Sequence, residues 1–214
     1  MTTCVGWELV RRGHLVRSLR LAPFAPAAVV VAYLVVRHPD PHDTVADLRV
    51  LALLLALGSG YVLDDGAATT LQASPYGLAR RLGLRIGGAV ALVAPLWTAM
   101  LGLLLPAIPK ADRWAAGLGL SVELAAGLAV VWAIAAWGRR GGIEQPGLIT
   151  TPALLALLLV AVSISRAPMV VDLGPQWTAA HLRWSAVVLG AVGALIAGGR
   201  DPAARWRPGR RTGS

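Results

Sequence analysis

The sequence predicts an all-α, polytopic membrane protein with six transmembrane helices, built as a single transmembrane domain over residues 1–214. Three observations predict this fold class: the composition, six recurring apolar runs and an uneven distribution of positive charge. The chain is 56% hydrophobic and only 14% charged, whereas soluble domains carry about 25% charged residues. A net charge of +9 is also typical of nucleic-acid-binding proteins. Because membrane topology explains this charge, we expect no nucleic-acid partner.

Six apolar runs account for the predicted spans. A transmembrane helix needs about 20 residues, which only the third and fourth runs provide alone. The first, second and fifth runs need flanking residues, and the sixth is the weakest. The sixth can also begin earlier, near Trp177, with Arg183 extending toward the membrane surface. The runs comprise residues 21–36, 48–63, 86–105, 114–137, 148–164 and about 184–197.

The positive charges predict the orientation. With the N-terminus inside, fourteen of the 20 lysines and arginines lie in inner segments, and six lie outside or at the outer margins, Arg49 among them. The positive-inside rule therefore places both termini in the cytoplasm. Residues 1–20 are expected to form an amphipathic helix on the cytoplasmic membrane surface, or else a disordered leader, and residues 198–214 a basic cytoplasmic tail. Nineteen arginines against one lysine indicate a GC-rich genome, and hence the plasma membrane of a bacterium.

The longest polar interruption between two apolar runs is residues 64–85, on the predicted cytoplasmic side. Its acids come first and its arginines last. Ser74 and Pro75 stand in the middle and have the pattern of a helix start, with Ser as N-cap and Pro at the first helical position. We therefore expect two short helices joined at Ser74, in a loop that a soluble partner can contact. The charged residues are Asp64, Asp65, Arg80, Arg81 and Arg85.

Two outer segments carry mixed residues. In residues 37–47, the spacing of four His and Asp side chains could suit weak metal binding. Pro39 and Pro41, however, rule out a regular helix face in this segment. We therefore expect a solvated loop without a metal. Residues 165–184 are expected to hold a re-entrant or interfacial helix before the sixth run. The four side chains are His38, Asp40, His42 and Asp43.

Gly119, Glu123 and Gly127 follow one another at four-residue spacing in the fourth run. Small residues on one stripe let helices approach closely. Glu123 is the only acid deep inside a predicted span, and an intramembrane carboxyl is costly unless it faces the bundle interior. Two interpretations stay open: a group on a transport pathway, or a carboxyl that only packs and hydrogen-bonds against a neighbouring helix.

The sequence lacks the motifs of enzyme chemistry. It has no G-x-x-x-x-G-K-[ST] segment, and its single lysine, Lys110, lies in an outer loop, so the chain cannot carry a phosphate-binding P-loop lysine. No histidine falls inside a predicted span, which argues against a bis-histidine haem site. We therefore expect no enzyme, cofactor or metal site in this chain. The histidines are His14, His38, His42 and His181.

Residues 64–85 resemble the permease subunits of ABC-2 type bacterial exporters, particularly actinobacterial ones. In that family the second span often ends in an acidic D-D-x-A-A-x-T-type segment, followed by Ser-Pro and a basic run. The resemblance in detail covers about 20 residues, and the six-span layout extends it over the whole chain. The matching residues are Asp64-Asp65, Ala67-Ala68, Thr70, Ser74-Pro75 and Arg80-Arg81.

The resemblance implies a type V exporter-like transmembrane domain and a division of labour. A separate ATPase subunit binds ATP and Mg²⁺, and two permeases, identical or different, form the path for a hydrophobic or amphipathic solute. The loop would then hold the ATPase-coupling residues Asp64, Asp65, Thr70, Ser74, Pro75, Arg80 and Arg81. Arg80 and Arg81 are equally explained as membrane-anchoring charges. The alternative function is a non-transporting membrane anchor or assembly subunit of a larger complex.

Overall fold

The computed structural model describes residues 22–37, 41–64, 78–143, 145–163 and 169–200. All secondary structure in these ranges is helical, which confirms the all-α class. Each predicted apolar run coincides with one α-helix. The helices are α2 (Ala25–Arg37, preceded by the 3-10 turn η1, Ala22–Phe24), α3 (Pro41–Val62), α4 (Leu78–Leu104, followed by η3, Leu105–Ala107), α5 (Arg113–Arg140), α6 (Gly147–Ser163) and α7 (Trp177–Gly199).

Four of these helices, α3, α4, α5 and α7, are long and apolar enough to cross a membrane. This indicates a multi-pass membrane protein. The apolar helices α2 and α6 fall short of the length of a span, so the described residues do not confirm six spans. The sixth run is stronger than its sequence predicts, because α7 begins at Trp177, the earlier of the two starts considered. Residues 169–176, just before α7, form no separate helix.

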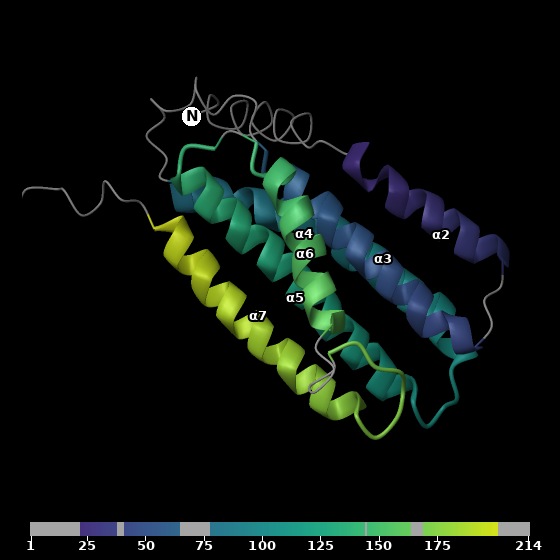
Figure 1. Ribbon diagram of the computed structural model, residues 1–214. Helices are drawn as coiled ribbons and strands as arrows, with labels where there is room; N and C mark the ends of the chain where they lie inside the picture. Colours follow the sequence, from purple (N-terminus) through teal and green to yellow (C-terminus); the bar gives the residue numbers. More distant parts are fainter. Residues whose placement is uncertain (1–21, 38–40, 65–77, 144, 164–168, 201–214) are drawn as a thin grey trace, which may run out of the picture.

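The bundle is built around α5 (Figure 1). α5 packs along α7 on one side and α3 on the other, and α6 packs against α3 and α5. Successive helices alternate in direction, so the bundle has two ends. At one end the terminus of α3 meets the start of α6 through Asp64 and Gly147, and we call this the Asp64 end. At the other, α3 meets α5 through Arg49 and Glu123, and we call this the Arg49 end.

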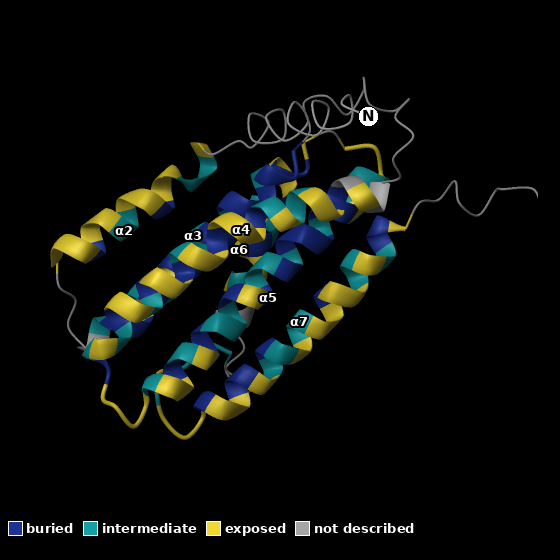
Figure 2. Ribbon diagram, turned by 180° about the vertical axis from the view of Figure 1, so that it is seen from behind, coloured by how far each residue is buried: buried dark blue, intermediate teal, exposed yellow. Residues whose placement is uncertain are grey.

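The helices α3 and α5 supply most of the buried apolar side chains. Toward the Arg49 end, Leu48, Leu51 and Leu120 are fully buried in one cluster, and toward the Asp64 end Val131 is fully buried in another. By contrast, α2 packs mainly against α3 among the described helices and presents a largely exposed outer surface (Figure 2). The interior of the bundle is therefore formed mainly by α3 and α5, with further buried side chains from α4 and α7.

The expected loop over residues 37–47 is wrong, because α3 begins at Pro41. A proline at the first helical position loses no hydrogen bond, since that N–H has no partner inside the helix. The early start also brings Arg49 into a candidate span, Asp43–Val62, instead of the outer margin. Asp43 pairs with Arg37 at 2.9 Å on the surface.

Several predicted segments lie outside the described residues. These are the N-terminal helix over residues 1–20, the basic tail from residue 201 onward, and most of the polar loop. Of the expected coupling residues, Asp65, Thr70, Ser74 and Pro75 fall in this category.

Candidate functional site

Arg49 of α3 and Glu123 of α5 form a buried ion pair. The guanidinium donates from Nε to Oε2 at 2.9 Å and from Nη2 to Oε1 at 3.0 Å. The two side chains are only 16% and 9% exposed. This two-point geometry matches the planar guanidinium to the planar carboxylate. Each charge therefore compensates the other in an apolar bundle, where an isolated charge would be costly.

His181 of α7 joins the pair. Its Nε2 lies 3.0 Å from Oε1 of Glu123, and its Nδ1 lies 2.7 Å from the carbonyl oxygen of Trp177. A neutral imidazole carries one N–H and can donate to only one of these acceptors, whereas the imidazolium donates to both. With its proton on Nε2, His181 donates to the carboxylate of Glu123 and so links α7 to α5.

Arg49 and the tryptophans extend this cluster to the segment before α7. Nη2 of Arg49 also donates to the carbonyl of Val171 at 2.6 Å, and its guanidinium lies 5.5 Å from the ring centre of Trp177. Trp184 donates from Nε1 to the carbonyl of Met169 at 2.8 Å. Side chains from α3 and α7 thus hold residues 169–171 against the Arg49 end of the bundle.

The small residues of the predicted stripe sit where helices come closest. A Cβ on Gly119 would lie 2.6 Å from Cζ2 of Trp177 and 2.7 Å from Nε2 of His181. A Cβ on Gly127 would lie 3.1 Å from Cβ of Ala56 on α3. Gly119 therefore allows α7 to approach α5, and Gly127 allows α3 to approach it. Glu123, between them, reaches both neighbouring helices.

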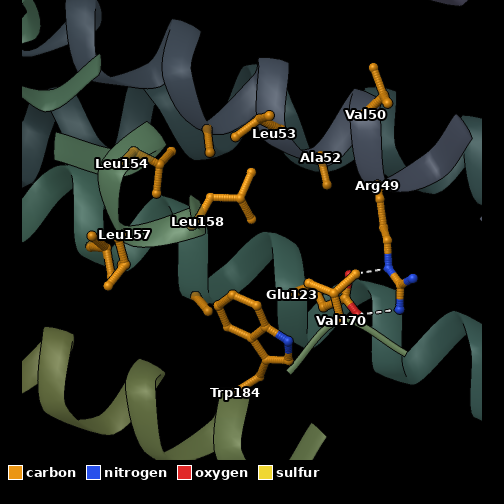
Figure 3. A pocket seen from close by; sticks show the side chains of 14 residues that line it. Arg49, Val50, Ala52, Leu53, Glu123, Leu154, Leu157, Leu158, Val170 and Trp184 are labelled. Atoms are coloured by element: carbon orange, nitrogen blue, oxygen red, sulfur yellow. Dashed lines mark hydrogen bonds and ion pairs between the residues drawn. The ribbon is translucent and has the colours of Figure 1, made fainter. Parts of the chain in front are cut away.

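An apolar cavity of about 220 Å³ lies beside this cluster, between α3, α5, α6 and α7 (Figure 3). Arg49 and Glu123 stand at one end of it, and among the described residues they are the only charged ones in its lining. The rest of the wall is apolar side chains apart from the indole of Trp184. Representative lining residues are Leu53 of α3, Val130 of α5, and Leu154 and Leu158 of α6.

The cavity reaches the outer surface of the bundle. Two of its lining residues, Val50 of α3 and Leu157 of α6, are 48% and 38% exposed. Both belong to apolar helices whose outer surfaces suit hydrocarbon rather than water. Among the described residues, the cavity therefore opens at an apolar face of the bundle, at Val50 and Leu157.

The described part of the polar loop is held against the bundle by hydrogen bonds. Asp64 is only 4% exposed, and its Oδ1 accepts the backbone N–H of Gly147 at 2.8 Å, at the first residue of α6. Arg85 donates to the carbonyls of Val62 and Asp64, and Arg139 donates to the carbonyl of Leu63. These contacts satisfy carbonyls that the end of α3 leaves without helical partners.

The two arginines predicted for coupling both lie in α4, near its start. The side chain of Arg80 is exposed, and Arg81 occupies a helical position. Of the seven predicted coupling residues, the structure describes the side chains of two, Asp64 and Arg80. Asp64 is enclosed and holds α6 in place, whereas Arg80 faces outward at the same end.

Sequence reasoning missed Arg49 and His181. The prediction that no histidine lies inside a span is wrong for His181, because α7 begins four residues before it. A lone arginine between Leu48 and Val50 was a usable signal, since a span rarely tolerates such a charge without an acidic partner. Glu123 was the only acid predicted to lie deep inside a span, and hence the expected partner of Arg49.

Among the described residues, no group of three or more His, Cys, Asp or Glu side chains is placed to hold a metal. No protein-family model, curated protein or solved structure matches this chain. The cavity and its charged end are therefore the features of the molecule that bear on its function.

Proposed function

We propose that this chain is the membrane-spanning permease subunit of an ATP-driven ABC exporter that moves a hydrophobic or amphipathic solute. The cavity supports this most directly. It lies among apolar helices, opens at the exposed Val50 and Leu157, and ends at the Arg49–Glu123 pair. Apolar walls suit a hydrocarbon group, and a few placed polar groups supply orientation, as in other small-molecule sites.

The proposal includes six spans, with both termini in the cytoplasm of a bacterium. α2 with its preceding turn has 16 residues and α6 has 17. At 1.5 Å per residue they extend about 24 Å and 26 Å, against a hydrocarbon core of about 30 Å. Flanking residues or local thinning of the bilayer would supply the difference.

Coupling to ATP is assigned to a separate subunit, which carries ATP and Mg²⁺ and acts on the loop over residues 64–85. This part of the proposal rests on the ABC-2 resemblance. The contacts at the Asp64 end support it mechanically, because Arg85 ties α4 to the end of α3, and Asp64 ties that end to α6. A displacement of the loop would therefore reach three helices. A second permease, identical or different, would complete the transport pathway.

A non-transporting membrane anchor is the second candidate. It is favoured by the completeness of the Arg49–Glu123–His181 cluster, in which both carboxylate oxygens accept hydrogen bonds. Such a cluster can serve helix assembly alone. The two functions therefore make different demands on partners, since only the exporter needs an ATPase.

The test is an affinity purification of the tagged full chain from its native membrane in mild detergent, followed by mass spectrometry. A stoichiometric ATPase subunit among the co-purifying proteins supports the exporter. Other membrane or surface proteins without an ATPase support the anchor. ATP hydrolysis by the purified chain alone would contradict both candidates.

A further inference from the structure

We propose that the cavity between α3, α5, α6 and α7 binds a single-chain amphipathic anion, namely a hydrocarbon chain that ends in one carboxylate. The chain would lie along the apolar wall, and the carboxylate at Arg49. This inference deepens the proposed function, because it names the class of solute that the permease would handle. Three features of the site carry it: its size, its entrance and its charge.

The size of the cavity favours one hydrocarbon chain. An engineered protein cavity of about 150 Å³ binds benzene, and the cavity here is about 220 Å³. It therefore admits a length of one hydrocarbon chain, with the rest of a longer chain extending through the mouth at Val50 and Leu157, but not the two acyl chains of a phospholipid. The leucines Leu53, Leu154 and Leu158 supply walls without polar atoms.

The entrance favours a molecule that reaches the site from lipid. The cavity opens at the exposed side chains of Val50 and Leu157. Neither side chain can form a hydrogen bond with a solute that arrives from the aqueous phase. Burying a hydrocarbon chain from water is favourable, so an amphiphile concentrates in the bilayer and reaches the cavity from there. A charged head group can then follow the chain as far as Arg49.

The charge of the site favours an anion over a cation. Arg49 and His181 both converge on Glu123, which is the only acid among the described residues that line the cavity. Both of its oxygens are already engaged. On Arg49, the hydrogen bonds within the described residues use Nε and Nη2, so Nη1 retains two N–H donors there. A carboxylate can accept from this guanidinium, whereas a cation would have to displace it from Glu123.

The experiment measures binding of radiolabelled dodecanoate to the full chain in lipid nanodiscs by scintillation proximity. Unlabelled dodecanoate and dodecyltrimethylammonium, which has the same chain length and the opposite charge, serve as competitors. We expect saturable binding, with the cation at least tenfold weaker than the anion. In the double variant Arg49→Gln/Glu123→Gln, which leaves neither charge unpaired, the preference for the anion should disappear.

A cavity-filling variant tests the location. Leu158→Trp should weaken dodecanoate binding at least tenfold, because the larger side chain occupies the space of the hydrocarbon. Leu189→Trp is the matched control on α7, where the leucine is 75% exposed and outside the cavity lining, and its binding should equal that of the wild type. Equal affinity for the two competitors, or full binding in Leu158→Trp, would overturn the proposal.

The assay does not depend on any ATPase, so its failure can be told apart from failure of the proposed function. A chain that co-purifies with an ATPase but binds no dodecanoate keeps its role as a permease and excludes this class of solute. A chain that binds dodecanoate with the expected preference, but has no ATPase partner, retains the site and loses the exporter role.

Discussion

Arg49 and Glu123 are 74 residues apart in the sequence and form a bidentate ion pair inside the helical bundle, with Nε–Oε2 at 2.9 Å and Nη2–Oε1 at 3.0 Å. The pair joins α3 to α5, and His181 extends it to α7. It also forms the polar end of the largely apolar cavity. One cluster therefore links the packing of three helices to the site proposed for the solute.

Replacing Glu123 by Gln should destabilise the protein strongly. The substitution leaves the guanidinium of Arg49 buried without a compensating charge, and breaking a buried pair in this way costs about 3–5 kcal/mol. The measurement is the unfolding midpoint of the purified chain in detergent. Arg49→Met combined with Glu123→Leu should be milder than Glu123→Gln alone, because no charge is left unpaired.

The matched control for this prediction is Asp43→Asn. Asp43 and Arg37 also form a carboxylate–guanidinium pair at 2.9 Å, but their side chains are 48% and 41% exposed. Exposed pairs contribute about 0–1 kcal/mol. If Glu123→Gln and Asp43→Asn lowered the unfolding midpoint equally, burial of the Arg49–Glu123 pair would contribute nothing to stability.

Gly119→Ala should separate α7 from α5. The new methyl group would lie 2.6 Å from the ring of Trp177 and 2.7 Å from His181, and neither ring can move without disturbing the cluster. We expect a loss of about 1–3 kcal/mol in unfolding free energy from overpacking. Gly102→Ala in α4 is the control, since its methyl group meets no atom within 4 Å and should stabilise the helix slightly. Similar midpoints for both variants would contradict the close approach of α7.

Asp64→Ala should loosen the start of α6. The substitution removes the acceptor of the Gly147 N–H, and an unsatisfied buried donor costs about 1–3 kcal/mol. Hydrogen exchange followed by mass spectrometry should show faster exchange at the first turn of α6. Asp112→Ala is the control, because Asp112 is exposed and makes no side-chain cap bond at the start of α5. Unchanged exchange at α6 in Asp64→Ala would rule out this structural role.

The proposed orientation can be read from single cysteines in a Cys4→Ser background, since Cys4 is the only native cysteine. Gln145→Cys lies at the Asp64 end and Asp112→Cys at the opposite end, and both positions are exposed. A membrane-impermeant maleimide should label Gln145→Cys only in inverted vesicles and Asp112→Cys only in right-side-out vesicles. The reverse pattern would place the N-terminus outside.

Much of the fold could be predicted from the sequence, because hydropathy alone marks where apolar helices lie. All six runs coincide with α-helices, and Glu123 was identified as a buried acid. Its partners were missed because Arg49 and His181 lie 74 and 58 residues away from it in the sequence, and no local spacing connects them. The same limit applies to Asp64, which a polarity pattern assigns to a surface loop although it is enclosed by the start of α6.

The error at the start of α3 has a different cause. Proline was treated as a helix breaker at Pro41, although at a first helical position it is favourable. The extra turns are what carry Arg49 into the bundle. Hydropathy predicted the position of α3 correctly. Where α3 begins then determined that Arg49 is buried.

The most direct test of the exporter account is whether ATP changes access to the cavity. Ala52 lines the cavity and is 5% exposed, so Ala52→Cys in the Cys4→Ser background adds a small reactive probe there. In native membranes, its alkylation by a membrane-permeant maleimide should change severalfold when ATP and Mg²⁺ are added, whereas Ala99→Cys, exposed on α4 outside the cavity, should not respond. An unchanged rate at Ala52→Cys, with the protein intact, would contradict ATP-driven alternating access and favour the anchor.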